Sequence, residues 1–155
     1  KVLSDGQSSR IYQKLVYERQ LAVAAFGGAN LIEDPNLFFA VAIVQPGVSP
    51  DAVEKALIAE FDRLKTEGVT TRELERAKNQ FARDYIVGRE SNEQKALHLS
   101  HAAVIHNDIT TADGEFDIFV KTTVADVQRV AQTYFTEANR LVLHIVPRGS
   151  GAASR

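Results

Sequence analysis

The sequence contains no cysteine and no methionine among its 155 residues. Without cysteine, the chain cannot form disulfides, thiolate zinc sites or iron–sulfur clusters, and it has no cysteine nucleophile. It also has no apolar run of the ~20 residues that a membrane-spanning helix needs. The longest such run, Leu37 to Val44, has the length of a strand. We therefore expect no membrane span.

The lack of methionine also bears on the origin of the chain. Translation begins with methionine, but this sequence begins with Lys1. We therefore expect a processed product or a piece of a longer protein. A piece would not show any secretory signal that its parent carries.

The chain has no excess of positive charge, since 18 Lys and Arg are set against 20 Asp and Glu, for a net charge of −2. A nucleic-acid or anionic-membrane partner would normally require a basic excess, so neither is expected. Hydrophobic residues at 45% and charged residues at 25% are typical of a globular protein. The length suits one domain, predicted over residues 1–147, with residues 148–155 (RGSGAASR) as a flexible tail.

Apolar periodicity predicts a helix and two strands in the first third of the chain. The helix covers residues 6–19, with apolar side chains at helical spacing. A strand over residues 21–26 follows and ends at a glycine pair. The next strand, residues 37–44, is apolar on both faces, which is typical of a strand covered on both sides.

Helix signals dominate the middle of the chain. Ser49 is a candidate N-cap for a helix that Gly68 ends, and Thr70 with Glu73 forms a capping box for the next helix. As one straight helix, the pattern that starts there would be about 50 Å long, so we expect a break around residues 88–91. The side chains predicted to face inward are Val53, Leu57, Phe61 and Leu64 in the first helix, and Leu74, Ala77, Phe81 and Tyr85 in the second.

The last third predicts two helices and a strand. A short helix covers residues 115–121, and Thr123 with Asp126 caps another, whose inward residues are predicted to be Val127, Val130, Ala131 and Tyr134. A closing strand is predicted over Arg140–Val146. Strands, then a block of helices, then a strand indicate an α+β fold in two layers. We expect a small, mostly antiparallel sheet packed against several helices and lacking its first strands.

Three of the four histidines stand close together in the sequence. His98 and His101 share a helix face and His106 follows, and three imidazoles could hold a catalytic zinc. However, the glutamate of HExxH or HxxEH is missing, and His106 would lie about 140° around the helix from His101. We therefore favour surface or helix-packing histidines over a metal site. His144 is interpreted as a partly exposed strand residue rather than a catalytic base.

Other motifs of catalysis are missing. There is no GxSxG elbow and no phosphate-binding glycine loop. Carboxylates that occur in pairs are interpreted as charges at helix starts, which the helix dipole favours. These pairs are Asp51 and Glu54, Glu73 and Glu75, and Asp113 and Glu115.

Three segments carry a family resemblance that covers Leu3 to Pro147. The opening SDGQSSRIYQKLVYERQLAV resembles the C-terminal half of the pitrilysin/insulinase family of zinc metallopeptidases, the inverzincins. In that family a glycine, two serines and an arginine open a helix that leads into a short strand. TTRELERAKNQFARDYI is similar to the family's long helix, and TTVADVQRVAQTYFTEANRLVLHIVP to its closing helix and edge strand.

The resemblance implies paired α+β domains that clamp around a chamber admitting extended peptides. Zinc is then held by HxxEH and a later glutamate, all in an N-terminal domain, and this sequence has no HxxEH. An arginine and a tyrosine of the C-terminal region would stabilise the developing negative charge. Their places fall here at Val16 and Val23, which have no side-chain donor. The resemblance thus implies no catalytic residue and no cofactor in this chain.

The function expected from the resemblance is that of a non-catalytic C-terminal domain. It would form a chamber wall in a zinc-dependent metallopeptidase, with zinc, peptide substrate and the zinc-bearing domain as partners of the parent. A second family subunit could supply the missing arginine–tyrosine pair. The alternatives are a structural or assembly module related to inactive scaffold members of the family, and a self-contained zinc enzyme using His98, His101 and His106. The family also implies the bacterial periplasm rather than the cytoplasm.

Overall fold

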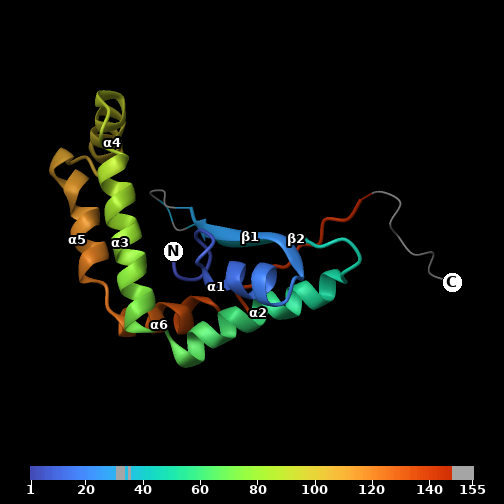
Figure 1. Cartoon of the computed structure of the whole chain (residues 1–155). Coiled ribbons are helices and arrows are strands. Elements are labelled where there is room, and N and C mark those ends of the chain that lie inside the picture. Colours follow the sequence, from blue (N-terminus) through green and yellow to red (C-terminus); the bar gives the residue numbers. More distant parts are fainter. Residues whose placement is uncertain (31–33, 35, 148–155) are drawn as a thin grey trace.

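The computed structural model describes residues 1–30, 34 and 36–147, so the tail predicted over residues 148–155 lies outside the described part. Figure 1 shows a short sheet with helices below it and a second group of helices to one side. The elements in chain order are α1 (Arg10–Tyr12), the π-helix η1 (Gln13–Glu18), β1 (Ala22–Ala29), β2 (Phe38–Val44), α2 (Pro50–Glu67), α3 (Thr71–Val87), α4 (Asn92–Ile105), the 3-10 helix η2 (Ile109–Asp113), α5 (Gly114–Lys121) and α6 (Val124–Tyr134).

The sheet is an antiparallel pair, β1 with β2. Ala25 lies opposite Ala42, and Phe26 lies opposite Val41, with an irregularity between Ala22 and Ala24. Successive side chains of a strand point to opposite faces, so Ala25 and Ala42 belong to one face and Phe26 and Val41 to the other. The face of Ala25 and Ala42 packs on the core. This arrangement confirms the predicted small antiparallel sheet and the α+β class.

The core lies between the sheet, the opening helical segment and α2. Ile11 and Leu15 are fully buried there, and α2 adds Val53, Ala56 and Leu64. An aromatic cluster closes one side of this core, where the ring of Phe61 lies 6.0 Å from Phe38 and 4.9 Å from Phe135. The apolar stripe predicted for α2 is confirmed, since Leu57 and Phe61 pack partly buried against the same cluster.

Helices α3, α4 and α5 form an arm beside this core (Figure 1). The predicted break is confirmed: α3 ends at Val87, and α4 begins after Ser91, whose side chain accepts a hydrogen bond from the backbone N–H of Gln94. Phe81 of α3 stacks on Phe119 of α5 with ring centroids 3.7 Å apart. The apolar stripe of α3 therefore packs mainly on α5 rather than in the central core.

Gly27 is required where the N-terminal segment crosses the sheet. A Cβ atom there would lie 2.3 Å from the carbonyl oxygen of Phe39 and 3.1 Å from Cβ of Ser4. The Gly27 N–H donates to the carbonyl of Ser4 at 3.0 Å. The absence of a side chain at this position therefore lets the two backbones approach.

Several sequence-based predictions are wrong. The strand over residues 37–44 is covered on one face only, since Phe39, Val41 and Ile43 are exposed. The strand predicted over Arg140–Val146 does not form. In the described part of the chain, the sheet holds only β1 and β2. Alternating apolar residues predict which faces a strand would present, but a ladder also needs a neighbour with free backbone groups. Val130 and Tyr134 of α6 are exposed instead of inward, and Ala131 is the buried residue of that helix.

Candidate functional site

The outer face of the sheet is apolar and open to solvent. We call this set the outer sheet face; each side chain is between 40 and 49% exposed, and the members are Val23, Phe26, Phe39, Val41 and Ile43. An antiparallel sheet with one solvated face normally carries polar residues on that face. Contiguous apolar surface of this kind marks interaction sites in soluble proteins. The outer sheet face is therefore a candidate docking surface.

The register brings the members of this face together from both strands. Phe26 is paired directly with Val41, while Ile43 pairs with Ala24 and Phe39 with Gly28. Directly opposed residues of an antiparallel pair have Cβ atoms about 5 Å apart, so the side chains form one continuous surface. The residues paired with Ile43 and Phe39 are small, so the large side chains of this face come mainly from β2.

The two positions that the resemblance assigns to an arginine and a tyrosine differ in how far their side chains are buried. Val16 belongs to η1 and packs partly buried against the core, while Val23 stands at the irregularity of β1 and belongs to the outer sheet face. Both side chains are aliphatic and cannot donate a hydrogen bond. Tyr17 next to Val16 is exposed, with its ring 5.5 Å from that of Tyr12.

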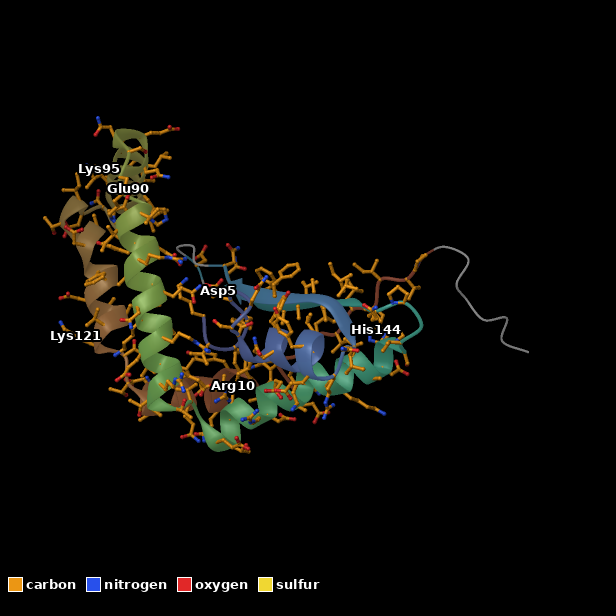
Figure 2. All side chains as sticks on the ribbon, in the orientation of Figure 1. Asp5, Arg10, Glu90, Lys95, Lys121 and His144 are labelled. Atoms are coloured by element: carbon orange, nitrogen blue, oxygen red, sulfur yellow. The ribbon has the colours of Figure 1, made fainter. Side chains whose placement is uncertain are left out.

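Arg10 of the opening motif forms a partly buried ion pair with Glu73. Its Nε donates to Oε1 of Glu73 at 2.7 Å, and Nη2 donates to Oε2 of Glu73 at 2.9 Å and to the carbonyl of Gly68 at 2.8 Å. The hydrogen bond from Arg10 is the main cause that lowers the pKa of Glu73 from 4.5 to about 2, and hydrogen bonds from Thr70 add to it. Figure 2 shows Arg10 near the place where α2 meets α3. Arg10 thus joins the opening helix to the start of the arm.

A polar cavity of about 190 Å³ lies beside this ion pair. Its walls carry charges of both signs, from Ser8, Arg10, Gln13, Lys14, Glu18, Glu60, Arg63, Glu73 and Arg76. Glu60 is buried within it, with Oε2 at 3.6 Å from Nη1 of Arg63. Opposite charges compensate one another around the cavity, which suits a structural network better than a site for a charged substrate.

The three histidines of the arm are not gathered into one ligand set in the part of the chain that the structure describes. His98 is bonded to Nη2 of Arg89, and its Nε2 lies 2.5 Å from the carbonyl oxygen of Ala112. The rings of His101 and His106 have centroids 6.2 Å apart. His98 thus connects α4 to the preceding turn and to η2, a packing role in the arm.

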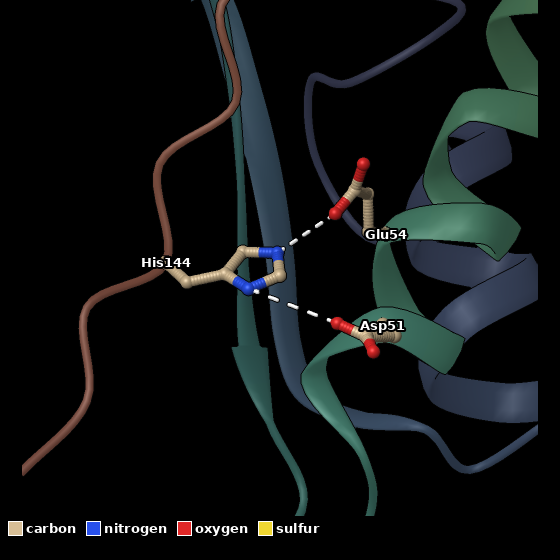
Figure 3. Close-up of side chains that lie close together, drawn as sticks. All are labelled: Asp51, Glu54 and His144. Atoms are coloured by element: carbon tan, nitrogen blue, oxygen red, sulfur yellow. Dashed lines mark hydrogen bonds and ion pairs between the residues drawn. The ribbon is translucent and has the colours of Figure 1, made fainter.

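A different histidine has carboxylate neighbours. His144 lies between Glu54 and Asp51 of the first turns of α2, as Figure 3 shows. Nε2 lies 2.8 Å from Oε2 of Glu54, and Nδ1 lies 4.0 Å from Oδ1 of Asp51. Sequence reasoning assigned the two carboxylates to the helix start and did not connect them with His144. No local signal could have done so, because 90 residues separate Glu54 from His144.

None of the helices in the described ranges is long and apolar enough to cross a membrane.

The amino-acid sequence matches the family model described as "Peptidase M16 inactive domain" over residues 1–81. Zinc protease PqqE of Helicobacter pylori (strain ATCC 700392 / 26695) is 29% identical over 147 residues, which are 95% of this chain and 33% of that protein. The chain thus spans about a third of the length of this curated relative.

Solved structures match the fold as well. A protease from Helicobacter pylori superimposes with a TM-score of 0.81 at 29% identity, covering 90% of this chain and 33% of the other. The inactive peptidase domain from Bordetella parapertussis gives a TM-score of 0.83 at 28% identity, covering 97% of this chain and 81% of the other. The second comparison shows that nearly all of this chain corresponds to one solved domain.

Proposed function

Because this chain belongs to the peptidase M16 inactive-domain family, we propose that it serves as the non-catalytic domain of a zinc-dependent peptidase. The outer sheet face carries this proposal, since it offers apolar surface with no catalytic group. In this role the domain closes a chamber around extended peptides, and the zinc-bearing domain of the same protein docks on the outer sheet face. The similarity to a zinc protease over 95% of the chain supports the assignment.

The chemistry of the chain supports a role without catalysis. The sequence has no HxxEH, and the family resemblance assigns its arginine and tyrosine to the positions of Val16 and Val23. Peptide hydrolysis with a zinc-activated water needs a general base and donors to the developing oxyanion. In this proposal the zinc and its base belong to the parent's other domain, and a second family subunit contributes the arginine and the tyrosine.

The energetics of docking follow from the exposed apolar side chains. Each 100 Å² of apolar surface removed from water contributes roughly 2.5 kcal/mol. Five half-exposed side chains on one face, two of them phenylalanines, supply enough such surface to hold a neighbouring domain of the same chain. Within one chain the association entropy is reduced because the partner is already close.

The experiment uses the intact parent protein and measures zinc-dependent cleavage of an extended peptide. Phe26→Asp places a charge at the centre of the outer sheet face, and we expect it to lower the cleavage rate because the domains no longer close. Leu97→Asp is the matched control, since Leu97 is an exposed apolar residue of α4 away from that face. Equal rates for the two variants, with both folded by circular dichroism, would refute the docking role.

A second candidate is a structural or assembly module, favoured by the aliphatic residues at positions 16 and 23. In that case the intact parent binds a partner through the outer sheet face but cleaves no peptide. If the parent has an HxxEH motif and cleaves peptides in a zinc-dependent reaction, the peptidase role is supported. If it has neither the motif nor the activity, the scaffold role is supported.

The proposed compartment is the bacterial periplasm, supported only by the family resemblance. Fractionation of cells that express the intact parent tests it. Recovery of the protein with periplasmic markers agrees with the proposal, and recovery with cytoplasmic markers contradicts it.

A further inference from the structure

The first turns of α2 and the C-terminal segment bring three metal-ligating side chains together. Asp51 and Glu54 come from α2, and His144 comes from residues 140–147. One ligand atom of each residue lies within 4.8 Å of the others. Among the residues that the structure describes, this is the only such group of three. We propose that Asp51, Glu54 and His144 bind a divalent transition-metal ion of the zinc type.

The donor set favours this class of cation. One imidazole nitrogen and two carboxylate oxygens are ligands that Zn²⁺ accepts, whereas Ca²⁺ and Mg²⁺ prefer oxygen donors alone. Three protein ligands leave a further position for water, and the side chains of Glu54 and His144, 33 and 37% exposed, give an ion access from solvent. An ion bound at Nε2 would take the place of the hydrogen bond between this nitrogen and Oε2 of Glu54.

The local charge decides whether a cation is attracted. The N-terminus of α2 carries a partial positive charge, which by itself repels a cation. The two carboxylates reverse the sign of the field at this point, because they bring two full negative charges against about half a positive one. Asp51 keeps most of its side chain in solvent, so it can turn toward an ion without breaking a buried contact.

Binding would have a structural consequence for the C-terminal segment. Residues 140–147 form no helix or strand, and Leu141, Leu143 and Ile145 are between 77 and 93% exposed. A metal held by His144 and the two carboxylates would fix this segment against α2. The site would therefore connect residues 140–147 to α2, the helix that packs against the sheet.

The test is titration of the intact chain, without a histidine tag, with ZnCl₂ in an isothermal calorimeter. We expect one Zn²⁺ per chain for the wild-type protein and at least about tenfold weaker binding for His144→Gln, since loss of a group that only hydrogen-bonds a ligand already costs about 10–100-fold in metal affinity. Glu54→Gln should weaken binding as well. Saturating Zn²⁺ should raise the Tm of the wild-type chain and leave that of His144→Gln unchanged.

His101→Ala is the matched control, because His101 is an exposed histidine on α4 with no carboxylate partner in this cluster. It should bind Zn²⁺ as the wild type does. The proposal is overturned if the wild-type chain shows no saturable binding, or if His144→Gln binds with unchanged affinity. It is also overturned if His101→Ala, rather than His144→Gln, abolishes binding, since the ion would then belong to the histidines of the arm.

Discussion

Glu73 allows a sharp test of the ion pair that joins the opening helix to α3. Its pKa falls from 4.5 to about 2, chiefly through hydrogen bonds from Arg10. At about 1.4 kcal/mol for each pH unit, this lowering corresponds to at most about 3.5 kcal/mol of folding stability. The Glu73 side chain is 21% exposed, so solvent screening reduces the figure, and we expect Glu73→Gln to cost about 2 kcal/mol at pH 7.

The contribution of Glu73 to the free energy of unfolding should decrease as the pH falls. A carboxyl whose folded pKa is lowered stabilises the protein above its unfolded pKa, and this stability is lost as the pH falls toward the folded pKa. The difference in free energy of unfolding between the wild type and Glu73→Gln should therefore be largest above pH 5 and decrease between pH 4.5 and about 2. Urea unfolding followed by circular dichroism at several pH values measures this difference.

The matched control for this prediction is Glu75→Gln, which removes an exposed carboxylate from the same helix. It should change the free energy of unfolding by less than about 0.5 kcal/mol at any pH. The reasoning is refuted if Glu73→Gln unfolds at the wild-type urea concentration at pH 7. It is equally refuted if the loss of stability for Glu73→Gln stays constant down to pH 2.

Two further substitutions test the packing of the core and of the sheet. Leu15→Ala, at a fully buried position, should cost about 3 kcal/mol of unfolding free energy by urea titration, and a cost below about 1 kcal/mol would contradict the buried core. Gly27→Ala should lower stability by about 1–3 kcal/mol because its Cβ would meet Phe39 and Ser4, whereas Gly28→Ala, with nothing within 4 Å, should stay within about 0.5 kcal/mol. Equal stabilities of the two alanine variants would show that the backbone approach at Gly27 is not as described.

Local signals predicted the helices well because each acts within one turn. The capping boxes of Thr70 with Glu73 and of Thr123 with Asp126 both form as predicted. The helix predicted over residues 6–19 is correct in its second half but starts later, at Arg10, and continues as a π-helix.

What failed depended on partners far along the chain. The pattern of residues 140–146 predicted alternating faces, but the sequence has no signal for which strand would pair with them. The carboxylates Asp51 and Glu54 look like ordinary helix-start charges until His144 is placed beside them. The outer sheet face was missed for a related reason: apolar residues on both faces of Leu37–Val44 predicted burial on both sides, and only the structure shows which side is open.

The central claim is that the outer sheet face is covered by another domain in the parent protein. The chain has no cysteine, so Ile43→Cys and the control Leu97→Cys each place a single thiol in it. Both should react at similar rates with a thiol reagent in this chain alone, since both positions are exposed. In the intact parent, we predict that the thiol at position 43 reacts at least about tenfold more slowly, while that at position 97 is unchanged. Equal reactivity of position 43 in both proteins would contradict the account.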